Sequence, residues 1–225
     1  TAELISSWSD EENPSPYCWF RGVSDVRHNL LPGAYWRNNY DEYGPLVSFS
    51  QEGGAYAEVG PVNSWETYYL AQHHGVPTRL LDWTESFSAA LFFALDGWDG
   101  TTSPCIWILN PSALNQASIN WGGIIAPNNF PDEMGIWLPN QIRNATHLIR
   151  FTEGFTYDNR KPLAIYPKKS NRRIVAQQGT FTVHGRDRKC LLDYINTEVP
   201  SPDSVIARII LDGAKIDECR RDLEM

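Results

Sequence analysis

The stretch QHHGVPTRLLDWT, residues 72–84, constrains the fold of this chain more than any other segment. The residues before it, 62–74, place aromatic side chains on one side of a predicted helix that ends at Gly75. A strand is expected directly after this turn, and residues 85–96 predict a short, nearly all-apolar helix that is buried on most sides. The segment is therefore expected to join two helices through a rigid turn and a strand.

Further strands are predicted where β-branched and aromatic residues cluster, at 17–22, 104–109, 163–167 and 179–185. Residues 202–223 predict a terminal amphipathic helix, because valine and isoleucine recur there at helical spacing. Strands separated by helices without regular βαβ spacing favour an α+β fold, a single domain with mixed or antiparallel β-sheets flanked by helices.

Residues 1–16 are polar and are expected to form a lead-in segment before a domain that covers 17–225. The sequence begins at Thr1 and stops within a charged helical pattern, as expected for a piece excised from a longer protein whose other domains are then candidate partners.

The net charge of −8 disfavours broad contact with nucleic acid or with an anionic membrane, because both require a positive field. No apolar run approaches the ~18 residues of a membrane helix, and the acidic N-terminus is unlike a signal peptide. The four cysteines are far apart and form no CxxC pair, which predicts free thiols in a reducing cytoplasm.

Arg21 is the first candidate binding residue, because it stands near the end of an aromatic strand and precedes Gly22. A guanidinium there can form a bidentate contact with a phosphate or a carboxylate. A glycine without a side chain lets a ligand or another backbone approach closely. A structural salt bridge at the strand end is the alternative for Arg21.

His73 and His74 are adjacent at the end of a helix, so at most one of them is expected to point into a cleft. Their spacing is not that of a zinc site, and no metal is expected. After the turn, Arg79, Asp82 and Thr84 are mixed with apolar residues, which suggests a buried polar network with Arg79 and Asp82 as the obvious pair.

Gln177 and Gln178 precede the predicted strand at 179–185, where their amides could orient a ribose or a base, or cap strand edges. The sequence contains no GxSxG, P-loop or GxGxxG motif.

Together, Phe20-Arg21-Gly22, QHHGVPTRLLDWT, the following FSAALFFA and RRIVAQQGTFTVHG resemble the FRG domain, a prokaryotic family named after the Phe-Arg-Gly triplet. The resemblance runs from about Tyr17 to the predicted terminal helix. It brings no settled activity, but the family's association with defence and toxin genes implies a bacterial toxin or phage-defence setting.

A second and weaker resemblance is to ADP-ribosyltransferases, and it implies a split sheet and NAD as substrate. On this resemblance, Arg21 would hold the NAD phosphate, and Asp82 with Thr84 would shape the nicotinamide pocket. Gln177 or Gln178 would stand near the glutamate that bonds the ribose 2′-hydroxyl in that superfamily. A glutamine can bond a hydroxyl but cannot stabilise an oxocarbenium charge as a carboxylate does.

The resulting hypothesis is an NAD-dependent ADP-ribosyltransferase or NAD glycohydrolase that acts on a protein or nucleic-acid acceptor, or on water. Its catalytic candidates are Asp82, Gln178 and His74. Its NAD-binding candidates are Arg21, Gly22, His73, Arg79, Thr84 and Gln177. The alternatives are a non-catalytic sensing or protein-interaction module with a structural polar core and, third, a nuclease, which the negative charge disfavours.

Overall fold

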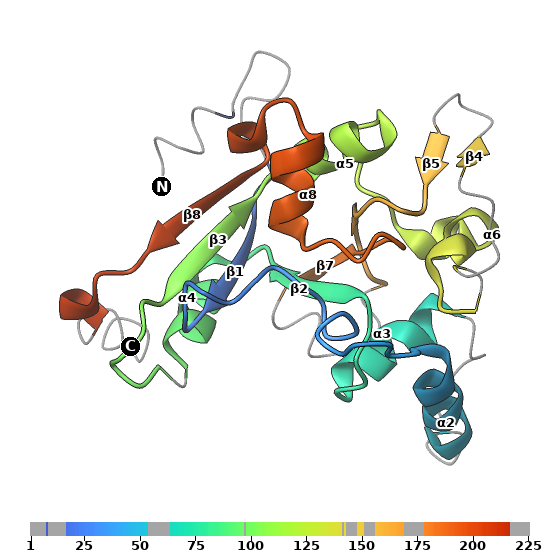
Figure 1. The fold of residues 1–225 in the computed structure, drawn as a ribbon, viewed down its shortest axis with the longest axis horizontal. Helices are drawn as coiled ribbons and strands as arrows, with labels where there is room; N and C mark the ends of the chain where they lie inside the picture. Colours follow the sequence, from blue (N-terminus) through green and yellow to red (C-terminus); the bar gives the residue numbers. More distant parts are fainter. Residues whose placement is uncertain are drawn as a thin grey trace.

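The computed structural model describes residues 8, 17–53, 64–96, 98–140, 142, 148–150, 156–168 and 178–216. They form a single α+β domain around a six-stranded antiparallel sheet in the order β6-β7-β2-β1-β3-β8 (Figure 1). The expected fold class is confirmed. The strands of the sheet are β1 (Trp19–Val23), β2 (Leu80–Thr84), β3 (Cys105–Leu109), β6 (Leu163–Ile165), β7 (Gly179–Val183) and β8 (Ile206–Ile210).

The α-helices of the described residues are α2 (Tyr43–Gly53), α3 (Trp65–His73), α4 (Phe87–Leu95), α5 (Pro111–Ile119), α6 (Pro131–Met134) and α8 (Leu191–Glu198). Short 3₁₀ turns are η1 (Pro127–Asn129), η2 (Gly135–Trp137), η3 (Pro202–Ser204) and η4 (Gly213–Lys215). The strands β4 (Leu148–Arg150) and β5 (Thr156–Asp158) pair antiparallel in a separate two-stranded sheet.

The sheet is divided between its two central strands. β1 and β2 pair only at Phe20 and Thr84, whereas β1 pairs along its full length with β3, and β2 does so with β7. The sheet thus consists of two three-stranded halves, β6-β7-β2 and β1-β3-β8, that are joined at a single position. The backbones of β1 and β2 do not pair elsewhere along these strands.

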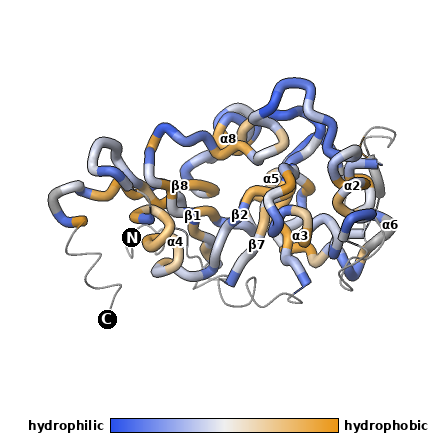
Figure 2. Tube along the Cα trace, turned by 90° about the horizontal axis from the view of Figure 1, so that it is seen from below, coloured by the Kyte–Doolittle hydropathy of each residue, from blue (hydrophilic) through white to orange (hydrophobic). Residues whose placement is uncertain are grey.

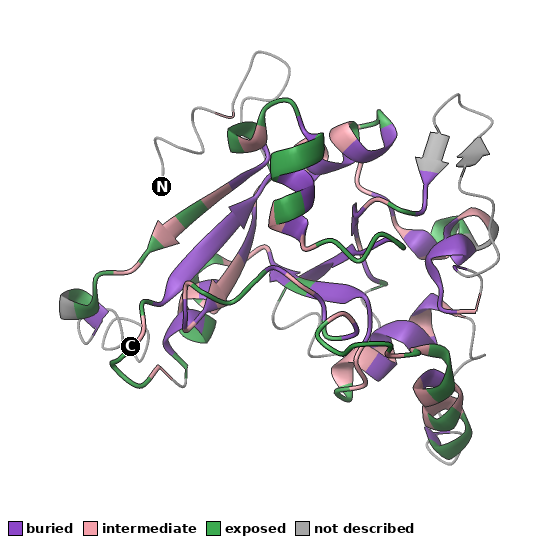
Figure 3. Cartoon of the chain, in the orientation of Figure 1, coloured by how far each residue is buried: buried purple, intermediate pink, exposed green. Residues whose placement is uncertain are grey.

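Helices cover both faces of the sheet, and Figure 2 shows α4 and α8 on opposite sides of it. Alternate residues of a strand point to opposite faces. Accordingly, Trp19 of β1 packs in a core cluster with Leu191 and Ile195 of α8, and Phe20 packs with Ala90 of α4. The aromatic rings of α3 pack with β2, β6 and β7 in a third cluster. Figure 3 shows buried residues along the inner strands and exposed residues on the outer turns of the helices.

The helix expected before the Gly-Val-Pro turn is confirmed as α3. Ser64 caps the helix, because its hydroxyl oxygen accepts a hydrogen bond from the backbone N–H of Thr67. The helix ends at His73, and Gly75 has a φ of +80°, a conformation that glycine adopts without steric cost. The turn then feeds directly into β2.

The helix predicted for 85–96 is confirmed as α4, but its expected burial on most sides is wrong. Only Ala90, Ala94 and Leu95 are buried, while Phe87, Phe92 and Phe93 are exposed. The small residues face β1 because Gly22 brings the helix into backbone contact: a Cβ on Gly22 would lie 1.7 Å from the carbonyl oxygen of Ala90.

The prediction of a helix over residues 202–223 is wrong for the residues that the structure describes. Residues 202–204 form η3, and 206–210 form β8, which pairs antiparallel with all five residues of β3. Residues 217–223 lie outside the described residues, as do 1–7 and 9–16 of the expected lead-in. Within the described residues, no helix combines the length and the apolar character that crossing a membrane requires.

Candidate functional site

A pocket of about 440 Å³ lies where β1 and β2 separate. Both strands line it, together with α3, α4 and the start of β7. Its wall consists of Phe20, Arg21, Gly22, Val23, Ser24, His28, Tyr69, Gln72, His73, Asp82, Trp83, Thr84, Phe93, Gly179, Thr180 and Phe181. Five of the predicted site residues, Arg21, Gly22, His73, Asp82 and Thr84, are therefore brought to one pocket.

Arg21 reaches from β1 toward β2, where its Nη1 donates to the backbone carbonyl of Asp82 at 2.8 Å. Its Nε is buried without a hydrogen-bond partner in the described structure. Burial lowers the pKa of the guanidinium, and the nearby carboxylate of Asp82 opposes that shift. Since arginine remains charged in proteins, the pocket contains a cation whose guanidinium has one hydrogen-bond acceptor among the described residues.

Asp82 is exposed to the pocket and is oriented by a chain of hydrogen bonds. The backbone N–H of Leu80 donates to the hydroxyl oxygen of Thr78, and the Thr78 hydroxyl donates to Oε1 of Gln72 at 2.6 Å. The amide of Gln72 is thereby oriented so that its Nε2 donates to Oδ2 of Asp82 at 2.9 Å. This arrangement holds one carboxylate oxygen and leaves the other for a ligand.

The two adjacent histidines point to different surroundings, as expected. His73 lines the pocket, whereas His74 caps the C-terminus of α3, is exposed and packs against Phe49 with ring centroids 5.7 Å apart. The histidine placed for contact with a ligand is therefore His73, and His74 lies outside the pocket wall.

Gly22 contributes by packing, since the backbone that approaches it is that of α4. Thr84 lines the pocket, and its hydroxyl oxygen accepts a hydrogen bond from the N–H of Ser86 at the start of α4. Gln178 is exposed outside the pocket wall, has a φ of +47° and uses its carbonyl oxygen to accept from the N–H of Glu85. Gln177 lies outside the described residues.

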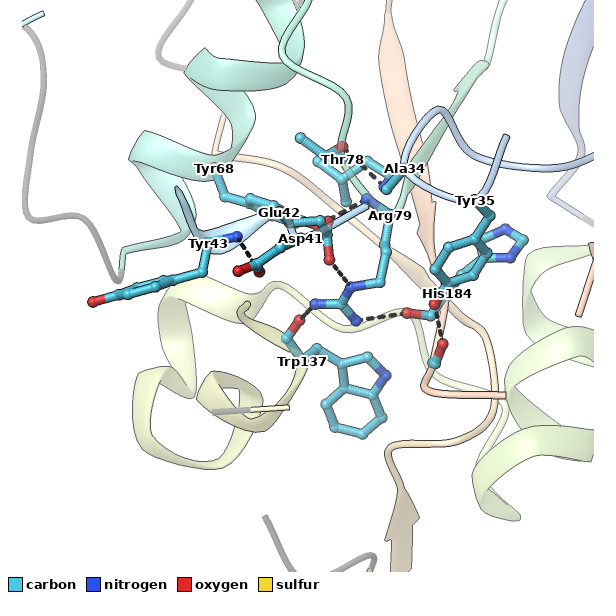
Figure 4. A network of polar contacts seen from close by, with 12 residues as sticks. Ala34, Tyr35, Asp41, Glu42, Tyr43, Tyr68, Thr78, Arg79, Trp137 and His184 are labelled. Carbon is cyan, nitrogen blue, oxygen red and sulfur yellow. Dashed lines mark hydrogen bonds and ion pairs between the residues drawn. The ribbon is translucent and has the colours of Figure 1, made fainter. Parts of the chain in front are cut away.

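Arg79 directly precedes β2 and is buried in a polar network outside the pocket wall (Figure 4). Its Nε donates to Glu42, its Nη1 to the carbonyl of His184 at 2.9 Å and its Nη2 to the carbonyl of Trp137. The expected pair of Arg79 with Asp82 is wrong: the charged partner of Arg79 is Glu42, which precedes α2, whereas the Asp82 carboxylate accepts from Gln72 in the pocket. Thus the motif supplies both the core, through Arg79, and the pocket, through Gln72 and Asp82.

Among the pocket residues that were not selected from the sequence are Gln72, Tyr69 and Thr180. Gln72 stands within the quoted motif, but its amide gains a role only through Thr78. Tyr69 was assigned only to the apolar side of α3, and it stacks on Phe181 with ring centroids 5.4 Å apart. Thr180 follows the two glutamines on β7 and could have been found by extending that segment by two residues.

Among the described residues, no group of three or more histidine, cysteine, aspartate or glutamate side chains could hold a metal ion. Of the described residues that line the pocket, Asp82 is the one with a carboxylate side chain. Glu85 accepts a hydrogen bond from the hydroxyl of Tyr166, and Glu153 lies outside the described residues.

Comparison with known proteins identifies one family: residues 16–101 match the family model of the FRG domain. The match covers less than half of the 225 residues, and the matched segment contains β1, α3, β2 and α4, which form most of the pocket wall. The extension of this domain to residue 225 stays a prediction. No significant match was found among curated proteins or solved structures, and the similarity to ADP-ribosyltransferases is not supported by these comparisons.

Proposed function

We propose that the pocket between β1 and β2 binds NAD and that the domain transfers or hydrolyses its ADP-ribose. The observation that carries this proposal is the guanidinium of Arg21, which lies in the pocket opposite an oriented carboxylate and has one hydrogen-bond acceptor in the described structure. A guanidinium with free N–H groups suits a phosphate, which accepts two parallel hydrogen bonds.

The proposed reaction breaks the bond between the ribose C1 and the nicotinamide nitrogen, and nicotinamide leaves with the bonding electron pair. The oxygen of water or of an acceptor hydroxyl then forms a bond to C1 and releases its proton. Positive charge develops on the ribose in the transition state. In this proposal the carboxylate of Asp82 stabilises that charge, and its orientation by Gln72 avoids a reorganisation cost during the reaction.

The remaining pocket residues have complementary parts in the proposal. The imidazole of His73 would contact a ribose hydroxyl. The rings of Phe20, Tyr69, Phe93 and Phe181 provide apolar surface for the nicotinamide or adenine ring. The proposed setting, a bacterial toxin or phage-defence protein, rests on the FRG family alone.

The second candidate is a non-catalytic module that senses a nucleotide. It is favoured by Gln178, a glutamine near the place where the enzyme resemblance implies a glutamate, which is exposed outside the pocket wall; among the described residues no late acidic side chain lines the pocket. The buried network of Arg79 also fits the structural polar core expected for such a module. The two candidates differ in whether bound NAD is cleaved.

The test is NAD binding by calorimetry and nicotinamide release by chromatography, with the wild type beside Arg21→Lys and Asp82→Asn. Arg21→Lys is expected to weaken NAD binding about 10- to 100-fold, because a single ammonium cannot replace a bidentate guanidinium. Asp82→Asn is expected to lower turnover about 100- to 1000-fold with little change in affinity.

Matched controls are Arg208→Lys, whose guanidinium stacks on Trp107 outside the pocket, and Asp99→Asn, whose partner is Thr101. Both should behave as the wild type. Binding that depends on Arg21 without nicotinamide release would favour the sensing module. Absence of both binding and release in the wild type would overturn the proposal.

A further inference from the structure

Within the part of the chain that the structure describes, the buried hydroxyl groups of Tyr69 and Thr180 in the pocket wall have no hydrogen-bond partner. Tyr69, on α3, is 4% exposed, and Thr180, on β7, is 1% exposed. The phenolic oxygen of Tyr69 and Oγ1 of Thr180 are both buried and unpaired, as is Nε of Arg21. Thus α3, β7 and β1 each carry one pocket-lining residue with a buried polar atom that is unpaired in the described structure.

Unpaired hydroxyls inside a protein are costly, because each loses its hydrogen bonds to water and gains none in return. The neighbouring residues show the usual solution. The hydroxyl of Tyr68 donates to Glu42 and accepts from the N–H of Arg79, and the hydroxyl oxygen of Thr182 accepts from the indole N–H of Trp83. Tyr69 and Thr180 therefore depart from their immediate neighbours in the same two elements.

We propose that the hydroxyls of Tyr69 and Thr180 are ligand-binding groups that complete, with Arg21, a donor set for a diphosphate-bearing nucleotide. This inference rests on the proposed function and adds two residues and a ligand class to it. A guanidinium and two O–H groups suit a ligand rich in acceptor oxygens, and the guanidinium contributes positive charge toward a diphosphate.

Ligand binding has to turn these groups toward the pocket, since both oxygens lie within its wall. Thr180 can do so by a change of one χ1 rotamer, which exchanges its hydroxyl with its methyl group. Tyr69 can do so by a tilt of its ring on Phe181. Burial raises the pKa of Tyr69 well above its ordinary value, so its hydroxyl keeps its proton and can donate at neutral pH.

The proposal predicts effects of opposite sign on stability and on binding. Tyr69→Phe and Thr180→Val remove an unpaired polar atom, so each should raise the melting temperature of the free domain by about 2–4 °C. Each should also weaken the binding of ADP and of inorganic pyrophosphate about three- to tenfold, as expected for one lost hydrogen bond. Replacing a residue that has only a structural role would not raise the melting temperature and weaken ligand binding at the same time.

The matched controls are Tyr68→Phe and Thr182→Val, which stand one and two residues away and lose hydrogen bonds that exist. They should lower the melting temperature and leave the affinity for ADP and pyrophosphate unchanged. Thermal melts and calorimetry on all five proteins measure both quantities.

Lowered melting temperatures in Tyr69→Phe and Thr180→Val, or unchanged affinities, would overturn the inference. The experiment separates failure of this inference from failure of the proposed NAD-cleaving function. If ADP binds in a manner that depends on Tyr69 and Thr180 but NAD is not cleaved, the donor set stands and the transferase proposal falls. If neither ADP nor pyrophosphate binds the wild type, the donor set falls.

Discussion

Arg79 shows how a single charged residue can hold distant parts of this chain together. Its guanidinium is buried among Glu42, the carbonyl of Trp137 and the carbonyl of His184. From the sequence, Asp82 was the natural partner because it is three residues away. Glu42 is 37 residues away, and nothing in a local pattern indicates a partner at that distance. Sequence reasoning therefore found the buried network but assigned the wrong acceptor.

Replacing Glu42 by glutamine should destabilise the domain by about 3–5 kcal/mol, because a buried guanidinium would lose its counter-charge. The side chains of Arg79 and Glu42 are only 3% and 10% exposed, so water cannot compensate. Glutamine keeps the size of the side chain and an acceptor for Tyr68, which isolates the loss of charge. Urea denaturation measures the change in the free energy of unfolding.

The control is Glu198→Gln, which breaks the exposed pair with Lys189 and should change stability by no more than about 1 kcal/mol. Equal effects of the two substitutions would contradict the argument that burial sets the strength of the Arg79 pair.

At the scale of elements, local patterns predicted those parts whose neighbours in sequence are also neighbours in space. Helix α3 has its cap and its terminating glycine within its own segment, and β3 is an unbroken apolar run buried at all five positions. Strand β8 was mistaken for a helix, because its valine and isoleucine spacing fits both structures. The segment forms a strand because it pairs with the edge of β3, which is about 100 residues away in the sequence.

Gly22→Ala should strongly destabilise the contact between β1 and α4, by about 3 kcal/mol or more, because the new Cβ would overlap the backbone of Ala90 and neither backbone can yield locally. Gly44→Ala is the control: it lies in α2 with no atom within 4 Å of the added Cβ, and helix propensity predicts a gain of about 0.5–1 kcal/mol. Denaturation midpoints of both variants test this, and a mild effect of Gly22→Ala would show that α4 can move away from the sheet.

The domain combines a packed core with a seam, the place where β1 and β2 separate beyond their pairing at Phe20 and Thr84. Only the core could be predicted clearly from the sequence. Periodicity and aromatic content predicted an α+β fold, and the motif residues Arg21, His73 and Asp82 were predicted as a site that the seam then brings together. The seam itself could not be predicted, because it depends on β1 and β2 pairing at one position only. The place of Tyr69 in the pocket wall could not be predicted for the same reason, whereas Thr180 lies only two residues beyond the predicted Gln178.

Acid should destabilise the domain through His184, which is 2% exposed and whose pKa is lowered to about 3 by burial. An unfolded histidine has a pKa of about 6.5, so the unfolded chain takes up the proton first as the pH falls. The contribution of a neutral His184 to stability is thus fully present above about pH 6.5 and is lost progressively below it, by up to about 1.4 kcal/mol per pH unit.

Urea denaturation of the wild type and of His184→Gln between pH 8 and 5 measures this dependence. The two proteins should show the same slope of stability against pH above pH 7, and the wild type should show the steeper loss below pH 6.5. Parallel curves throughout would indicate that His184 is protonated within the folded domain.

The ties of Arg79 also bear on the order in which the chain can fold during synthesis. Glu42 and Tyr68 leave the ribosome before Arg79, but the carbonyls of Trp137 and His184 that complete its coordination are made much later. The segment 16–101 also contains β1 and β2 without β3 and β7, the strands with which they pair along their length. We therefore expect that the segment matched by the FRG model does not fold alone: released by itself, it would present a charged core residue and two unpaired strand edges, and it should be a substrate for chaperones and proteases.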